Sequence, residues 1–169
     1  MEGSTISKYT AILISFTLFY SLLGCSISQE VSAYTSEEID FDRQAKEYLS
    51  NMQSHIHNFD TISKNAEPPY TDPVLLGNLQ EELDQAIQEA QSIIDLNCPS
   101  SRFDRLCGDF VNLRDALISL RDDMVHYYAS GLGASERQKI IDDMNALTTS
   151  NKNIADDYAQ LETQYGKIK

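Results

Sequence analysis

The sequence predicts an all-α protein, an up-down-up-down antiparallel four-helix bundle over residues 36–169. Four segments carry apolar residues at alternating spacings of three and four, which is the repeat of one buried helix face. Short breaker segments separate them, and matched helix lengths with short connections favour antiparallel neighbours. Val is scarce and no apolar run is bounded by hairpin turns, so we expect no strand. The alternative is an extended helical hairpin that completes its core with a partner chain.

The composition limits the class of protein. The chain has 169 residues, 41% of them hydrophobic, which is enough for one domain with its own core. Only 7 Gly and 4 Pro, with no Trp, argue against a low-complexity tail, a collagen repeat or a Gly-rich nucleotide fold. The 13 Lys and Arg against 26 Asp and Glu give a formal net charge of −13. Such a surface repels phosphate backbones, so nucleic acid is not an expected partner.

Residues 1–24 are predicted to be an export signal. Lys8 and the free amine make a weakly positive start, and an uncharged run from Tyr9 to Leu23 follows. This run of about 15 residues is shorter than the roughly 20 that span a hydrocarbon core. It therefore fits the apolar region of a signal peptide better than a membrane-spanning helix.

The uncharged run ends in Leu22-Leu23-Gly24-Cys25. This pattern resembles the lipobox of bacterial lipoproteins. The resemblance implies cleavage before Cys25, a thioether-linked diacyl or triacyl lipid on Cys25, and attachment to the cell membrane or outer membrane on its extracytoplasmic side. Several acyl chains on one residue are enough for stable attachment. Residues 25–35 would then be a polar, lipidated tether. The alternative is an uncleaved anchor in which this Cys lies by chance.

The first two helices are predicted over 36–64 and from Pro73 to about Leu96. Ser36 can cap the first helix, and Asp72 directly before Pro73 is a typical start signal for the second. Their apolar stripes are Phe41, Ala45, Leu49, Met52, Ile56, Phe59 and Ile62, then Leu76, Leu79, Leu83, Ala86, Ala90 and Ile93.

The last two helices are predicted from Ser101 or Arg102 to about Tyr128 and over 135–165. Ser135 with Gln138 three residues later is typical of a capping box. The stripes are Phe103, Leu106, Phe110, Leu113, Leu117, Leu120, Met124 and Tyr127, then Ile140, Met144, Leu147, Asn151, Ile154, Tyr158, Leu161 and Tyr165. A lone polar Asn151 in such a stripe is expected to set helix register.

Cys98 and Cys107 lie on either side of the turn between the second and third helices. An antiparallel hairpin brings these positions face to face, and an exported protein is in a compartment that permits disulfides. The three cysteines then divide into one lipidation site, Cys25, and one disulfide, Cys98–Cys107.

The chain carries none of the motifs typical of nucleophilic hydrolases, covalent haem, nucleotide-binding loops or di-iron bundles. We therefore expect neither enzymatic activity nor a cofactor. Asp122-Asp123 and Asp142-Asp143 are nearly equidistant from the last turn, and His126 lies one helical turn from Asp122. Together these five residues are a weak candidate for a cation site. A solvated acidic face is the favoured interpretation of that group, and Asp156-Asp157 are also expected at the surface.

The sequence thus predicts a lipid-anchored extracytoplasmic protein that acts as an interaction or structural module at the cell envelope, with a protein partner. The alternative is a sensor that holds a cation or small ligand between its helices. A cavity at Asn151, or one between Asp123 and Asp143, would favour the sensor.

Overall fold

A computed structural model describes residues 34–64, 72–130 and 133–168 of the chain. The predicted signal peptide, Cys25 and most of the predicted tether lie outside this part. Within the described residues all regular structure is helical and no strand occurs. The helices are α2 (Ser36–Lys64), α3 (Pro73–Asp95), the short 3-10 turn η2 (Ser101–Phe103), α4 (Asp104–Ser130) and α5 (Ala134–Tyr165).

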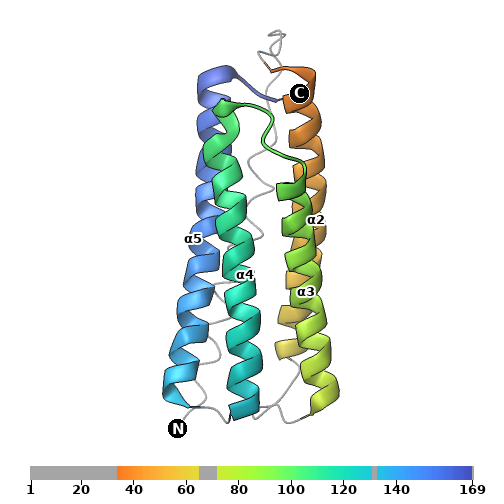
Figure 1. Ribbon diagram of the computed structural model, residues 1–169, viewed down its shortest axis with the longest axis vertical. Coiled ribbons are helices and arrows are strands. Elements are labelled where there is room, and N and C mark those ends of the chain that lie inside the picture. Colours follow the sequence, from red (N-terminus) through yellow and green to blue (C-terminus); the bar gives the residue numbers. More distant parts are fainter. Residues whose placement is uncertain (1–33, 65–71, 131–132, 169) are drawn as a thin grey trace.

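The four long helices lie side by side along the long axis of the molecule (Figure 1). Each contacts the next one along the chain: α2 packs on α3, α3 on α4 and α4 on α5. The all-α class is therefore confirmed, and the described residues form a helical bundle.

The start of α2 is fixed by Thr35 and Glu38. The backbone N–H of Thr35 donates to Glu38 Oε2 at 2.8 Å, and the Glu38 N–H donates to Thr35 Oγ1 at 3.2 Å. This reciprocal pair is a capping box, in which each side chain satisfies a backbone donor that the helix leaves open. Ser36 was the predicted cap, and this was wrong by one residue, because Ser36 already belongs to the helix.

The start of α3 is the predicted one. Asp72 Oδ1 accepts a hydrogen bond from the Val74 N–H at 2.9 Å, and Pro73 fills the first helical position. The capping box predicted for the last helix is wrong: α5 begins at Ala134, after Gly133, with no side-chain cap. Gln138 instead donates to Asp142 within the helix.

The predicted apolar stripes form the core. Fully or nearly buried are Phe41, Ala45, Leu49, Met52, Ile56 and Phe59 of α2, Leu79, Leu83, Ala86, Ala90 and Ile93 of α3, Phe103 of η2, and Leu106, Phe110, Leu113, Leu117, Leu120 and Met124 of α4. Because these residues repeat every three or four positions, one face of each helix is buried along its length.

The stripe of α5 differs from the prediction at two polar positions and at its last residue, Tyr165, which is exposed. Leu147, Ile154 and Leu161 are buried as expected, but Asn151 is only partly buried. The buried polar residues of α5 are Ser150 and Asp157. Asp157 was expected at the surface, and this was wrong. Positions 147, 150, 154, 157 and 161 keep the three-four spacing as regularly as the stripe through Asn151, so the spacing alone does not choose between the two.

The polar contacts between neighbouring helices share one order: as the residue number rises along one helix, the number of its partner on the next helix falls. The hydrogen bonds are Asn51–Glu89 and His55–Glu82 between α2 and α3, Arg114–Gln91 and Arg121–Asp84 between α3 and α4, and Ser119–Asp143 and Arg105–Gln160 between α4 and α5.

Candidate functional site

One end of the bundle carries the predicted disulfide. Cys98 follows α3, Cys107 lies in the first turn of α4, and a disulfide joins them with their Cα atoms 6.0 Å apart. A separation of this size is within the usual range for a disulfide. The backbone reaches this geometry through Asn97, whose φ of 60° is a left-handed conformation that Asn tolerates better than most residues. The bond therefore links the end of α3 to the start of α4.

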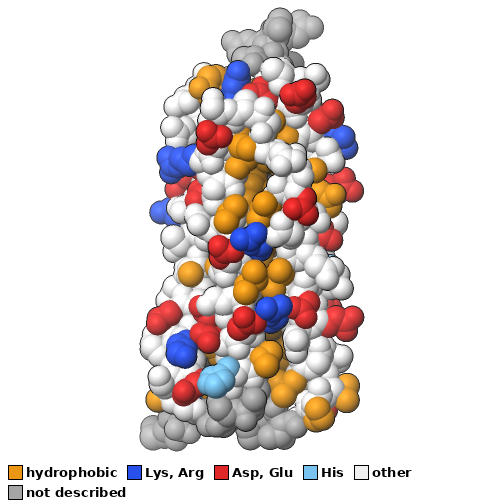
Figure 2. Space-filling view, in the orientation of Figure 1, with side chains coloured by type: hydrophobic (Ala, Val, Ile, Leu, Met, Phe, Trp, Pro, Cys, Tyr) orange, Lys and Arg blue, Asp and Glu red, His pale blue; other side chains and the backbone are white. Residues whose placement is uncertain are grey.

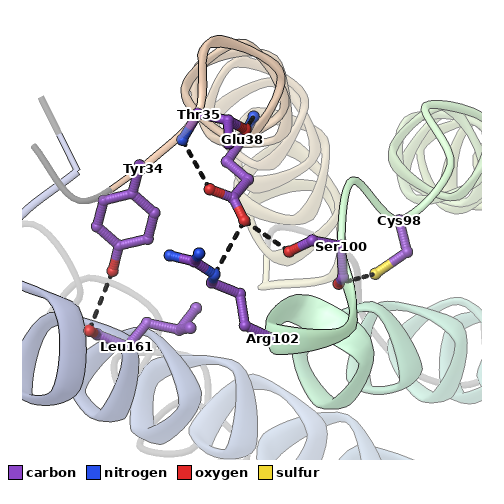
Figure 3. Close-up of polar contacts among 7 residues, drawn as sticks. All are labelled: Tyr34, Thr35, Glu38, Cys98, Ser100, Arg102 and Leu161. Carbon is purple, nitrogen blue, oxygen red and sulfur yellow. Dashed lines mark hydrogen bonds and ion pairs between the residues drawn. The ribbon is translucent and has the colours of Figure 1, made fainter.

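The Glu38 cluster lies beside this disulfide. Figure 3 shows the Glu38 carboxylate between the Thr35 N–H, the Ser100 hydroxyl and the Arg102 guanidinium. Ser100 donates to Glu38 Oε1 at 2.6 Å, and Arg102 Nε lies 3.1 Å from the same oxygen. Glu38 is only 1% exposed. One carboxylate thus ties the start of α2 to the segment between α3 and α4.

Two opposing effects act on the Glu38 pKa. Burial raises it, but the hydrogen bonds from Ser100 and Thr35 and the charge of Arg102 favour the ionised form. The net result is a pKa below the ordinary value of Glu. The carboxylate is thus ionised and held in place at neutral pH.

Tyr34 holds the residues directly before α2 against α5 and η2. Its hydroxyl donates to the Leu161 carbonyl of α5 at 3.0 Å (Figure 3), and only 6% of the residue is exposed. Its ring meets Phe103 and Tyr165 edge to face, at 6.1 and 6.3 Å between centroids. The Arg102 guanidinium lies over both tyrosine rings. The packed part of the chain therefore begins before residue 36, where we had placed the domain boundary.

Cys25 lies outside the described residues. Of the helices described, none is long and apolar enough to cross a lipid bilayer.

The weak cation candidates are only partly brought together. Ser119 donates to Asp143 Oδ1 at 2.7 Å, and the carboxyls of Asp143 and Asp123 interact across the α4–α5 contact. Asp122 is instead paired with Arg121, and Asp142 accepts from Gln138. The His126 side chain is exposed. In the part of the chain that the structure describes, no group of three or more His, Cys, Asp and Glu side chains is arranged to hold a metal ion.

A second carboxyl pair, Asp109–Asp157, also lies between α4 and α5. The two residues are 8% and 3% exposed, and their carboxyls interact directly. Arg105 Nε lies 2.7 Å from Asp157 Oδ1, and Asn112 donates to Asp109 at 3.2 Å. We missed this pair in the sequence, although the spacing from Leu147 through Ile154 to Leu161 includes position 157.

Asp42 on α2 is a further buried acid, and it faces α5. Lys46 Nζ lies 2.8 Å from Asp42 Oδ2 and 5.4 Å from the centre of the Tyr158 ring. Burial raises the pKa of Asp42, while Lys46 and the Tyr158 hydroxyl oppose the rise. Burial and the nearby Asp42 raise the Tyr158 pKa well above its ordinary value, so this phenol stays protonated.

A hollow lies between α3 and α4, at the end away from the disulfide. It has a volume of about 290 Å³ and is lined by Pro73, Leu76, Gly77, Leu79, Gln80, Leu83, Arg121, Met124 and Val125. Figure 2 shows hydrophobic side chains running along the face that α3 and α4 present, with charged side chains across and beside them. Val74 and Val125 are exposed near this end. The hollow is thus largely apolar, with the Arg121 guanidinium at its edge.

Comparison of the chain with protein-family models, curated proteins and solved structures found no match.

Proposed function

We propose that the protein is a lipid-anchored extracytoplasmic module that acts at the cell envelope through contact with another protein. The Cys98–Cys107 disulfide, in a chain that also carries the Leu22-Leu23-Gly24-Cys25 pattern, is the observation that supports this most. Disulfides persist in oxidising compartments and are rare in the cytosol. The lipobox resemblance and the disulfide point independently to export.

We propose further that the bundle has up-down-up-down topology. The cross-helix pairs described above support it, because the residue numbers run in opposite directions in each consecutive contact. His55 and Asn51 meet Glu82 and Glu89 in reverse order, for example. The apolar stripes of one chain fill this core, so the bundle needs no second chain to complete it.

The position of Tyr34 limits how far the bundle can lie from the membrane. Nine peptide units separate Cys25 from Tyr34. At about 3.3–3.6 Å per residue, such a tether spans at most about 30 Å. If Cys25 carries the lipid, Tyr34 and the disulfide end of the bundle stay within about 30 Å of the bilayer surface.

Membrane attachment is tested by Cys25→Ala in the native host. The unchanged protein should stay in the membrane fraction, and mass spectrometry of its N-terminal peptide should find a diacylglyceryl group on Cys25. The variant should lose both the lipid and membrane retention. Unaltered processing and retention in the variant would exclude the anchor.

The contact role is tested by crosslinking in intact cells. Recovery of the same envelope protein with the unchanged chain, and its loss with Cys25→Ala, would support a partner at the membrane. The redox state of Cys98 and Cys107 is the control for export to an oxidising compartment. Thiol counting under denaturing, non-reducing conditions should find neither of them free.

The hollow between α3 and α4 favours a second function, the binding of a small apolar ligand. Its volume is close to the lower limit of small-molecule sites. It is not at Asn151 or between Asp123 and Asp143, the two places where a cavity would have favoured the sensor. Toluene can serve as the probe, because a ligand that binds only the folded protein raises the Tm. Gly77→Leu, which should fill the hollow, would abolish the rise, whereas the control Gly108→Leu on α4 would keep it.

A further inference from the structure

Where α5 meets its neighbours, the cationic side chains do not fully neutralise the charge of the buried carboxyl groups. Asp157 is nearly inaccessible and faces Asp109 and Arg105 on α4, with Asp156 beside it on α5. The Arg105 side chain is 66% exposed and also donates to Gln160. Its charge is therefore screened by water and shared with a second group, whereas both carboxyls are removed from water.

Two carboxylates in such a place cannot both be ionised without a large repulsion, and one retained proton converts the repulsion into a hydrogen bond. Burial and the interaction with Asp109 raise the pKa of Asp157 to about 6, and Arg105 offsets only part of this rise. This pair therefore gains or loses a proton close to neutral pH.

A second pair, Asp123–Asp143, lies along the same interface nearer the other end of α5. Burial raises the pKa of Asp143, the charges of Asp123 and Asp142 raise it further, and the hydrogen bond from Ser119 opposes them. Both pairs join α4 to α5. By contrast, the contact between α3 and α4 includes an ion pair of opposite charges, Arg121 with Asp84.

We infer that the α4–α5 contact is a proton-operated latch, in which protonation of the pairs Asp109–Asp157 and Asp123–Asp143 closes α5 against α4 and their ionisation loosens it. Loosening at neutral pH would expose the apolar stripes of α4 and α5, while α2, α3 and α4 remain packed. The bundle is thus tighter in a mildly acidic compartment than in a neutral one.

The opposite behaviour is expected if Arg105 and Asp157 act as a simple ion pair. Acid would then remove the attraction and loosen α5. The direction of the pH effect therefore distinguishes the latch from an ion pair.

The test is hydrogen exchange of the full chain at pH 5.0 and pH 7.5, corrected for the intrinsic effect of pH on exchange. The α5 amides should open roughly tenfold more at pH 7.5, since a pKa near 6 when closed and an ordinary one when open give this ratio. The α2–α3 amides should change less. Equal α5 protection at the two pH values, or weaker protection at pH 5.0, would overturn the proposal.

The variants separate the latch from general charge effects. Asp157→Asn is uncharged and can donate to Asp109, so α5 should stay protected at pH 7.5. Asp109→Asn should do the same from the α4 side, which keeps the test open if one variant folds poorly. The control Asp156→Asn removes the same charge from an exposed neighbour, which raises the Asp157 pKa less than burial and Asp109 do, so most of the pH difference should remain. If the control behaves like Asp157→Asn, or if both pair variants lower α5 protection at pH 7.5, the latch is wrong.

Discussion

Tyr34 holds the start of the packed chain in place through contacts with residues that are distant in the sequence. Its position beside polar residues in the sequence suggested a tether, because no helical repeat extends to it. The structure places its ring against Phe103 and Tyr165 and its hydroxyl on the Leu161 carbonyl. Sequence periodicity cannot identify such a residue, because it lies before the helix and its partners are far along the chain.

Substitutions of Tyr34 should separate its two contacts. Tyr34→Phe removes only the hydrogen bond to Leu161 and should lower the free energy of unfolding by about 0.5–1.5 kcal/mol. Tyr34→Ala removes the buried ring as well and should cost about 3–5 kcal/mol. Urea unfolding measures both values. Equal losses for the two variants would show that the ring contributes little.

Glu38 is the second residue whose role depends on distant partners. Its capping box with Thr35 could be found from a Thr followed three residues later by Glu, but its contacts with Ser100 and Arg102 could not. Glu38→Gln should destabilise the fold by about 1.5–3 kcal/mol, since hydrogen bonds to a charged group are weakened. Glu37→Gln, an exposed neighbour, is the matched control and should change unfolding by less than about 0.5 kcal/mol.

At the scale of the elements, α4 has two long helical neighbours, because it packs on both α3 and α5. Its stripe keeps three-four spacing from Leu106 to Met124, and Leu113 and Leu117 are completely buried. An unbroken stripe on a helix with two neighbours leaves little freedom in where that helix can lie.

Truncation of this stripe should be costly. Leu113→Ala or Leu117→Ala should lower the free energy of unfolding by about 2–5 kcal/mol, through lost burial and the cavity left behind. Thermal or urea unfolding provides the measurement, with Ile118→Ala on the less buried side of α4 as the control. Losses below about 0.5 kcal/mol at both leucines would mean that this face is not packed.

The disulfide also acts between elements, because it links the end of α3 to the start of α4. The bond closes a loop with a sequence separation of 9, which should stabilise the fold by about 2.5–3 kcal/mol on the chain-entropy account. Cys98→Ser with Cys107→Ser should therefore lower the Tm without abolishing the helical circular dichroism signal, because the core stripes remain. Complete loss of helix would show that the bond is essential to folding.

For the whole molecule, the buried acids predict a stability maximum in mild acid. The folded-state pKa of Asp157 is raised to about 6, so its contribution is full at low pH and is lost as the pH rises through 6. The folded-state pKa of Glu38 is lowered below 4.5, so its contribution is present above 4.5 and is lost as the pH falls below that value. The negative net charge also decreases toward acid, which reduces self-repulsion.

Urea unfolding from pH 3.5 to 8 should accordingly give the greatest stability at about pH 4–4.5, a loss as the pH rises to about 6, and a smaller change above that value. The loss toward pH 8 should be smaller in Asp157→Asn, and the loss toward pH 3.5 smaller in Glu38→Gln. A stability that rises steadily up to pH 8 would contradict the assignment of the buried carboxyls.

The sequence by itself determined the all-helical class, the approximate extent of each long helix and nearly all of the apolar core. These properties depend on residues three or four apart in one chain segment, which the sequence displays directly. It also indicated the Cys98–Cys107 disulfide, because the two positions flank one turn.

Only the tertiary structure decided which acids are buried. Asp156 and Asp157 are adjacent and chemically identical, yet one is exposed and the other is enclosed by α4. The partners of Glu38 and Tyr34, the Asp109–Asp157 pair and the hollow beside Leu76 likewise depend on how the helices lie against one another. Burial and charge pairing are properties of surfaces that meet, so a single helix pattern does not determine them.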